Sequence, residues 1–238
     1  MTPLETQLKW IQEANGNLQD YDCSICRNKG FTFRIKDEEI VSRICKCMEI
    51  RKGIREIRES GIGEKDLDTF KTNNDFQKSL LKMAKDYLLN GEERWFFIGG
   101  QSGCGKSHLC TGILRELACK GKTIAFMSWV PDTKRLVDSY YDGEYSRIMA
   151  RYKNVDVLYI DDLFKQKRGE KLSNSQITIA YDIINHRELN NKKTIISSEY
   201  LIDDIVGFDE AIGSRIYSMS DKYIINIASD QKRNFRMN

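Results

Sequence analysis

The sequence predicts an α/β fold, in which a central parallel sheet is flanked by helices and preceded by a small cysteine-rich module. Three observations predict it. Short apolar runs alternate with helical segments from about residue 61 onward, a glycine-rich turn follows the first of these runs, and two cysteine pairs stand near the N-terminus. Alternating strands and helices are typical of a parallel sheet that is covered on both faces.

The composition is that of an ordinary globular protein. The 238 residues, of which 40% are apolar and 31% charged, suffice for one full-sized domain and a small satellite. No apolar run approaches the ~20 residues that a membrane helix needs, and the N-terminus lacks a signal pattern, so we expect a cytoplasmic protein with no membrane partner. The net charge of +3 is too small to predict nucleic-acid binding by the whole chain, so any such contact must be local.

The first domain is expected to span residues 1–60. Apolar residues at helical spacing predict a short helix within residues 1–20 and a connecting helix from Met48 to Ser60. Between them, the strand-like runs FTFRI and EEIVSRI lie within residues 21–48, which is the size of a zinc hairpin.

Two cysteine pairs flank these strand-like runs. Cys23 and Cys26 have the spacing of a metal knuckle, and Cys45 and Cys47 form a second, tighter pair. Four thiolates suit a tetrahedral Zn²⁺ ion, which is the usual structural site in a module too small to fold on its own core. A disulfide set is not expected in a reducing compartment, so the alternative is four free thiols. The sequence therefore predicts a small N-terminal zinc-binding domain.

The second domain is expected to span residues 61–238. The runs that predict its strands are WFFIG, TIAFMSW, DVLYIDD, KTIISSEY and KYIINIA. Helices are expected over residues 76–89, 107–119, 132–151, 173–189 and 208–219. Only about ten residues follow the last strand, so we expect no helical lid after the sheet.

The glycine-rich turn GQSGCGKS, from Gly100 to Ser107, matches the P-loop pattern G-x-x-x-x-G-K-S. It follows a strand and opens a helix, a context that favours a phosphate site over a glycine-rich turn with an incidental lysine. Glycines let the backbone wrap around phosphate oxygens, and the helix N-terminus directs N–H groups at them. Lys106 is expected to reach the β- and γ-phosphates of ATP, and Ser107 to offer a hydroxyl to Mg²⁺. The residues expected to contact the nucleotide are Gly100, Gln101, Ser102, Gly103, Cys104, Gly105, Lys106, Ser107 and His108.

The run VDVLYIDDLF ends in two carboxylates. Because it is a buried strand of a parallel sheet, Asp161 and Asp162 are expected to emerge at the carboxyl edge, beside the phosphate site. Asp161 would hold the Mg²⁺ shell and Asp162 would orient or polarise the attacking water, which predicts an ATPase. The alternative, that the pair only ends the strand, is disfavoured by the P-loop upstream.

Five motifs stand in a fixed order along the chain: GQSGCGKSHL, LYIDDLF, IINHREL, TIISSEY and IGSRIYSM. This ordered set resembles the DnaC/DnaI group of bacterial and phage helicase loaders, which implies an AAA+ ATPase core over residues 61–238. The likeness extends to the front module, since DnaI-like proteins often carry a cysteine-rich N-terminal domain that binds the helicase. The transposition ATPases of the IstB type are close relatives.

The resemblance implies roles for residues beyond the P-loop. Arg215 is expected to be an arginine finger that acts on a neighbouring subunit, which requires self-association; the alternative is a surface arginine on a helix. Arg187 matches a family arginine to which we assign no role, and it is the second candidate beside Arg215. Glu199 occupies the position of the family's sensor asparagine, and a carboxylate repels phosphate. Either a preceding serine, for which we choose Ser198, senses the γ-phosphate, or sensing is weakened.

A segment rich in lysine, arginine and tyrosine lies between the second strand and the acidic pair. Helicase loaders grip single strands with this region, through aromatic stacking and cationic contacts to the backbone. The alternative is a solvated helix face, because acidic residues are interspersed. The candidates for contact with single-stranded DNA are Tyr140, Tyr141, Arg147, Arg151, Lys153, Lys165, Lys167 and Arg168. The C-terminal segment around Arg236 is expected to be a solvated tail; the alternative is that Arg236 approaches the nucleotide.

The resemblance thus implies an ATP-dependent loader that places a hexameric DnaB-type replicative helicase on single-stranded DNA, with the zinc module docked on the helicase. One alternative is an IstB-like ATPase that assists a transposase. Another is a P-loop kinase of small molecules, which would need a substrate lid and basic residues for the acceptor. A third is a zinc-bearing binding module whose nucleotide site is only structural.

Overall fold

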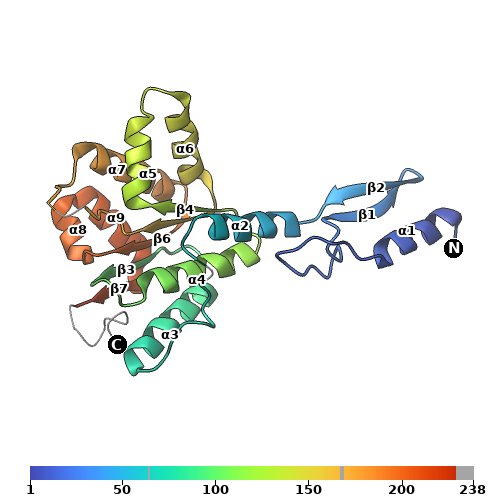
Figure 1. Cartoon of the computed structure of the whole chain (residues 1–238), viewed down its shortest axis with the longest axis horizontal. Coiled ribbons are helices and arrows are strands. Elements are labelled where there is room, and N and C mark those ends of the chain that lie inside the picture. The colour runs from blue at the N-terminus through green and yellow to red at the C-terminus, as the bar shows by residue number, and fades with distance from the viewer. Residues whose placement is uncertain (64, 167–168, 229–238) are drawn as a thin grey trace.

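The computed structural model describes residues 1–63, 65–166 and 169–228, which form a front module and an α/β body (Figure 1). The front module contains α1 (Pro3–Glu13), β1 (Phe31–Lys36) and β2 (Glu39–Ile44), and α2 (Cys47–Glu59) leads from it to the body. The body contains α3 (Asp75–Asn90), β3 (Phe96–Gly100), α4 (Lys106–Cys119), β4 (Ile124–Ser128), α5 (Trp129–Asp138), α6 (Gly143–Asn154), β5 (Val157–Asp161), α7 (Asn174–Leu189), β6 (Lys193–Ser198), α8 (Ile202–Phe208), α9 (Glu210–Ser220), a 3₁₀ turn (Asp221–Tyr223) and β7 (Ile224–Ile227).

The front module is a helix followed by a hairpin, as the sequence predicts. Thr2 and Glu5 form a capping box at the start of α1, which packs against β1. β1 and β2 pair antiparallel, with Phe31 opposite Ile44. The two residues that join them, Asp37 and Glu38, have φ of 50° and 59°, the left-handed conformation that a two-residue hairpin turn needs.

The body is built on one parallel sheet of five strands in the order β4-β5-β6-β3-β7. β6 therefore lies between the strand that precedes the P-loop and the strand that ends in the acidic pair. One face of the sheet carries an apolar cluster with α3, α4 and the end of α2, and the other face carries a cluster with α5 to α9. The predicted fold class, a parallel sheet covered on both faces, is confirmed.

The connecting helix α2 packs on the body along its apolar stripe. Ile50, Ile54 and Ile57 are buried, and α2 contacts α4. Gly53 lies where a Cβ atom would stand 3.1 Å from the Cβ of Ala118 in α4, so the close approach leaves little room for a side chain. Cys47 at the start of α2 belongs to the cysteine cluster of the front module. The helix is therefore shared by both parts, and the boundary at residue 60 stays a prediction.

Two expected helices differ from the structure. The helix expected over residues 132–151 is two helices, α5 and α6, because Asp142 caps a new helix by accepting a hydrogen bond from the Glu144 amide. The helix expected over residues 208–219 is α9, and α8 precedes it; Asp209 separates the two and caps α9 by accepting from the Ile212 amide.

Three expectations from the sequence concern a membrane helix, a helical lid and the C-terminal tail. Within the described ranges, no helix is long and apolar enough to cross a membrane. The expectation that no helical lid follows the sheet, and that of a solvated tail around Arg236, fall on residues 229–238, which lie outside the described residues.

Arg187 of α7 has a structural role that the sequence did not reveal. Its side chain is fully buried and donates to the carbonyls of Tyr152, Val155 and Lys193 at 2.8, 3.0 and 2.5 Å, and to Thr194 Oγ1 at 3.0 Å. Burial lowers the pKa of Arg187 to about 9, which still leaves it charged at neutral pH. The guanidinium thus joins the end of α6 to the start of β6.

We expect Arg187→Met to lower the free energy of unfolding by about 3 kcal/mol or more, because several buried carbonyls lose their donor at once. Urea denaturation followed by circular dichroism measures it. The control is Arg147→Met on α6, whose side chain is 77% exposed, and which should change stability by less than about 0.5 kcal/mol. Equal stabilities of the two variants would contradict the role of Arg187.

Candidate functional site

The P-loop has the backbone that its glycines were expected to allow. Gly100, Gly103 and Gly105 have φ of 123°, 82° and 91°, in the region that favours glycine. A Cβ on Gly100 would lie 2.0 Å from the carbonyl oxygen of Ile227, so only glycine fits between β3 and β7. Gly105 is the N-cap of α4, and the unpaired N–H groups of the first turn therefore line the loop.

Lys106 lies inside this loop. Only 5% of the residue is exposed, and Nζ donates to the carbonyls of Gly100 at 2.6 Å and Gln101 at 2.8 Å. Cys104 is buried and its Sγ donates to the same Gln101 carbonyl at 3.0 Å, in keeping with its expected place as a small residue that fills the loop. The ammonium group is thus held where phosphate oxygens would meet it.

The carboxylate of Asp161 collects hydroxyl groups from three elements. Its Oδ1 accepts from Ser107 Oγ at 3.0 Å, from Tyr159 OH at 2.5 Å and from Ser197 Oγ at 2.7 Å. The predicted pair, Ser107 and Asp161, is therefore brought together. A hydroxyl and a carboxylate side by side at the head of a P-loop helix are the hard oxygen donors that Mg²⁺ takes from proteins, so the residues present fit the ion.

Asp162 lies beside this pair in a strained conformation. Its φ is 59°, and its amide donates to Ser197 Oγ at 3.0 Å. Its carboxylate Oδ2 lies 2.7 Å from Nζ of Lys165, and the same Nζ lies 3.0 Å from Oε1 of Glu199. Lys165 therefore lies at the nucleotide site, and its expected contact with single-stranded DNA stays a prediction.

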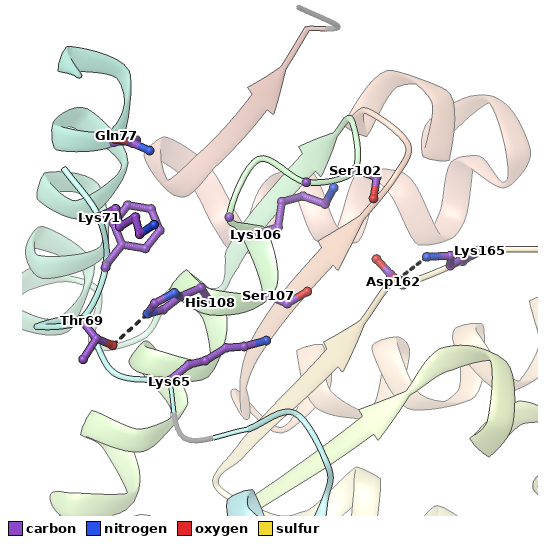
Figure 2. Close-up of a pocket in the computed structure, with 13 residues that line it drawn as sticks. Lys65, Thr69, Lys71, Gln77, Ser102, Lys106, Ser107, His108, Asp162 and Lys165 are labelled. Carbon is purple, nitrogen blue, oxygen red and sulfur yellow. Dashed lines mark hydrogen bonds and ion pairs between the residues drawn. The ribbon is translucent and has the colours of Figure 1, made fainter. Parts of the chain in front are cut away.

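A cavity of about 320 Å³ runs past the P-loop (Figure 2). Ser102, Lys106 and Ser107 lie in its middle. At one end it is bounded by side chains from α3 and from the segment before it, and at the other by Asp162 and Lys165. This volume lies in the range of small-ligand sites, and an elongated space suits a nucleotide whose phosphates lie at the P-loop.

The sequence did not reveal the residues at the first end of the cavity. They are Lys65, Thr69, Phe70, Lys71 and Gln77. Their only signal was a cluster of polar and aromatic residues in an irregular stretch before a helix. His108, predicted as a nucleotide contact, faces this end; its Nε2 lies 2.9 Å from the Asp66 carbonyl oxygen and 3.2 Å from Thr69 Oγ1, and its ring packs edge-on against Phe70.

Ser198, predicted as a nucleotide contact, does not reach the P-loop. It is fully buried and its Oγ donates to the Leu163 carbonyl at 2.8 Å. Side chains alternate along β6, so Ser197 lies on the face that carries α4 and Ser198 on the opposite face. Ser197 is therefore the serine that contacts Asp161.

Arg215 of α9 lies away from the cavity, with its side chain against α7. Its Nε lies 2.7 Å from Glu188 Oε2, and its guanidinium lies over the Tyr181 ring, 5.3 Å from the centroid. Arg215 is not among the cavity-lining residues of its own chain. Its expected role as an arginine finger therefore depends on a neighbouring subunit and stays a prediction.

The candidate DNA contacts differ in exposure and in ion pairing. Tyr140 and Tyr141 are 61% and 99% exposed at the turn between α5 and α6, and Arg147 nearby is 77% exposed and lies 3.3 Å from Glu144. Arg151 pairs with Glu56 of α2, and Lys153 lies 3.9 Å from Asp182. Lys167 and Arg168 lie outside the described residues.

The four predicted zinc ligands form one cluster. The Sγ atoms of Cys23, Cys26, Cys45 and Cys47 all lie within 4.8 Å of one another, with Cys23 and Cys45 at 3.8 Å and Cys26 and Cys47 at 3.5 Å. Zinc–sulfur bonds of about 2.3 Å in a tetrahedron require sulfur separations of about 3.8 Å, so the residues fit a Zn²⁺ ion.

Two further contacts lie at this cluster. Burial acts to raise the pKa of Cys26, but the Gly30 amide and the Cys47 thiol lower it to about 7, whereas burial and the contact with Cys26 raise the pKa of Cys47 to about 12. Arg51 of α2 is buried beside the cluster and donates to the Tyr21 carbonyl at 2.5 Å and to Asn28 Oδ1 at 3.0 Å. Its charge offsets part of the negative charge of four thiolates around one divalent ion. No pattern in the sequence indicated this role of Arg51.

Comparison with known proteins relates the chain to replication proteins. A family model described as the bacterial DnaA ATPase domain matches residues 71–219. The phage-like element PBSX protein XkdC of Bacillus subtilis (strain 168) is 32% identical over 235 residues, which cover 90% of this chain and 85% of XkdC.

Solved structures of similar fold agree with this relation. AMPPCP-bound DnaA from Aquifex aeolicus has a TM-score of 0.58 at 22% identity, and the match covers 74% of this chain and 53% of that chain. A DnaC helicase loader has a TM-score of 0.58 at 22% identity, and the match covers 71% of this chain and 98% of that chain. The chain therefore spans about half the length of the solved DnaA protein. At these identities the likeness shows the fold.

We expect a zinc chelator to unfold residues 21–48 and to leave nucleotide affinity in place, because the P-loop and its neighbours lie on the body. Metal analysis and hydrogen exchange of residues 21–48 measure the effect. Cys26→Ser should act like the chelator, whereas Cys119→Ser, at a cysteine outside the cluster, should not. Metal-free protein with unchanged exchange in this segment would refute the zinc site.

We expect Lys106→Ala to lower the affinity for ATP by about 10- to 100-fold, the worth of one charge-assisted contact to phosphate. Titration with a fluorescent ATP analogue measures it. The control is Lys85→Ala on the exposed side of α3, which should bind like the unmodified protein. Unchanged affinity in Lys106→Ala, with the fold intact by circular dichroism, would contradict the site.

Proposed function

The chain belongs to the family of the bacterial DnaA ATPase domain, and on that premise we propose that it loads a hexameric DnaB-type replicative helicase onto single-stranded DNA. It is an AAA+ ATPase with a nucleotide site at the P-loop. In the proposal, ATP with Mg²⁺ drives assembly, and the front module, stabilised by Zn²⁺, docks on the helicase.

One observation carries this proposal. The fold likeness runs over 98% of the DnaC helicase loader but over 53% of the solved DnaA chain. The likeness thus covers nearly all of the solved loader chain and about half of the solved initiator chain. The cysteine module in front of the body supplies a separate surface for a partner, as a loader requires.

The residues of the P-loop support ATP hydrolysis. Lys106 would exchange the loop carbonyls for the β- and γ-phosphate oxygens. Ser107 and Asp161 would hold Mg²⁺, which neutralises charge on the phosphates. Asp162 would orient the attacking water, whose oxygen bonds to the γ-phosphorus as the bond to the ADP oxygen breaks.

Arg215 supports the dependence of hydrolysis on assembly. Glu188 and Tyr181 hold its side chain against α7, apart from the cavity of its own chain. In an assembly of several subunits, this surface would face the cavity of the neighbour. There the guanidinium would stabilise charge on the transferring phosphate, so that hydrolysis requires the neighbour.

The turn between α5 and α6 supports a contact with single-stranded DNA. The ring of Tyr140 packs edge-on against both Tyr141 and Tyr145, and Tyr141 is almost fully exposed. Bases of any sequence can stack on such rings, while Arg147 attracts the backbone phosphates. This arrangement provides the sequence-tolerant grip that a loader needs.

Exposed apolar side chains on the front module support its role in docking. Trp10 of α1 is 77% exposed, Ile25 of the cysteine knuckle 75% and Ile44 of β2 66%. Large apolar side chains that remain exposed on a small module are typical of a surface for a protein partner.

We expect the protein to bind a DnaB-type helicase and, with ATP, to increase helicase loading on a closed single-stranded DNA circle, measured by unwinding of an annealed fluorescent oligonucleotide. The double variant Trp10→Ser with Ile25→Ser should weaken helicase binding at least about tenfold, as for removal of an interface anchor. ATP turnover should stay unchanged, because both residues lie on the front module.

The control for docking is Leu89→Ser, an apolar residue of α3 that is 80% exposed on the body. It should bind the helicase normally. ATP turnover stimulated by DNA with no binding to any helicase would refute the loader and favour the IstB-like alternative. Phosphorylation of a small molecule would favour the kinase.

A further inference from the structure

Lys165 joins two carboxylates at one end of the nucleotide cavity. Its Nζ lies 2.7 Å from Asp162 Oδ2 and 3.0 Å from Glu199 Oε1. Asp162 follows β5 and Glu199 follows β6, so the ammonium group bridges the carboxyl ends of two neighbouring strands. Figure 2 shows Lys165 beside Asp162, across the P-loop from Thr69 and Gln77.

The position of Lys165 resolves the electrostatic problem that Glu199 poses. A carboxylate alone at this edge of the sheet would repel the phosphates. Partial burial opposes the charge on Lys165, but the Asp162 and Glu199 carboxylates raise the pKa of Lys165, so the ammonium stays protonated at neutral pH. The Lys165 ammonium group therefore balances the negative charge of Glu199 at this end of the cavity.

The ammonium group also has a donor to spare for a ligand. Lysine carries three N–H donors, and the two carboxylates engage two of them. Lys165 lines the cavity together with Lys106 and Ser107 from the P-loop, and its Nζ points toward Asp162 (Figure 2). The P-loop and the start of α4 hold the β-phosphate, and the Mg²⁺ ligands lie beside Asp162, so a γ-phosphate would point toward this end of the cavity.

We propose that Lys165, oriented by Asp162 and Glu199, distinguishes ATP from ADP by contacting the γ-phosphate. The contact takes the place of the neutral sensor side chain that Glu199 replaces. This role of Lys165 rests on the nucleotide site of the proposed function. It depends on that site alone, since neither helicase nor DNA takes part. ADP has no phosphate at this end, so its affinity does not involve Lys165.

The test compares the affinities of ADP and of the non-hydrolysable ATP analogue AMPPCP, both with Mg²⁺, by isothermal titration calorimetry on the full chain. We expect Lys165→Met to weaken AMPPCP by about 10- to 100-fold and to leave ADP unchanged, because one charge-assisted contact is lost. Lys165→Arg, which keeps the charge, should restore part of the discrimination.

The matched control is Lys192→Met, just before β6 at the opposite end of that strand. Lys192 is also ion-paired, to Asp156 at 3.5 Å, and its side chain is 32% exposed against 37% for Lys165. It should leave both affinities unchanged. Thermal melts of each variant show that the fold is retained.

Other outcomes would overturn the proposal in recognisable ways. If Lys165→Met binds ADP normally and still prefers AMPPCP as the unmodified protein does, Lys165 does not read the γ-phosphate. Equal weakening of both nucleotides would make Lys165 a general support of the cavity, which also overturns it. If the unmodified protein binds neither nucleotide, the nucleotide site of the proposed function fails as well.

Discussion

The catalytic edge of the sheet depends on one carboxylate oxygen. Oδ1 of Asp161 accepts hydroxyl groups of Ser107, Tyr159 and Ser197, which come from α4, β5 and β6. These three bonds fix the P-loop helix against two strands, and they hold the carboxylate beside Ser107, which lines the cavity. Because β6 lies between β3 and β5, the serine of β6 can reach across to the strand that carries the acidic pair. Phosphate binding and metal binding therefore share a single anchor.

The parts of the fold that the sequence predicts are those encoded in contiguous residues. Strand runs were recognisable because buried parallel strands are almost purely apolar, and all five lie where expected. The P-loop and the cysteine pairs follow from fixed spacings, since backbone wrapping and tetrahedral ligation require particular residue types at particular separations. The fold class and the cysteine cluster are confirmed for the same reason.

The other features of the site could not be predicted, because they depend on which side chains meet across the fold. Ser197 and Ser198 are adjacent in sequence, and only the pleat of β6 decides which one meets Asp161. Lys165 seemed part of a basic loop because its partners, Asp162 and Glu199, come together only through the pairing of β5 and β6. The irregular segment at one end of the cavity has no periodic pattern that would predict it. The break between α5 and α6 depends on one residue, Asp142, which caps the start of α6.

The helix α2 connects the cysteine cluster rigidly to the α/β body. Its first residue, Cys47, belongs to the cysteine cluster, and its later turns pack on α4, the helix that begins at Lys106 (Figure 1). A continuous helix of 13 residues is about 20 Å long and is stiffer than a flexible linker of the same length. A load applied to the cysteine end would therefore pass along α2 to its contact with the C-terminal end of α4, without any contact to the nucleotide itself.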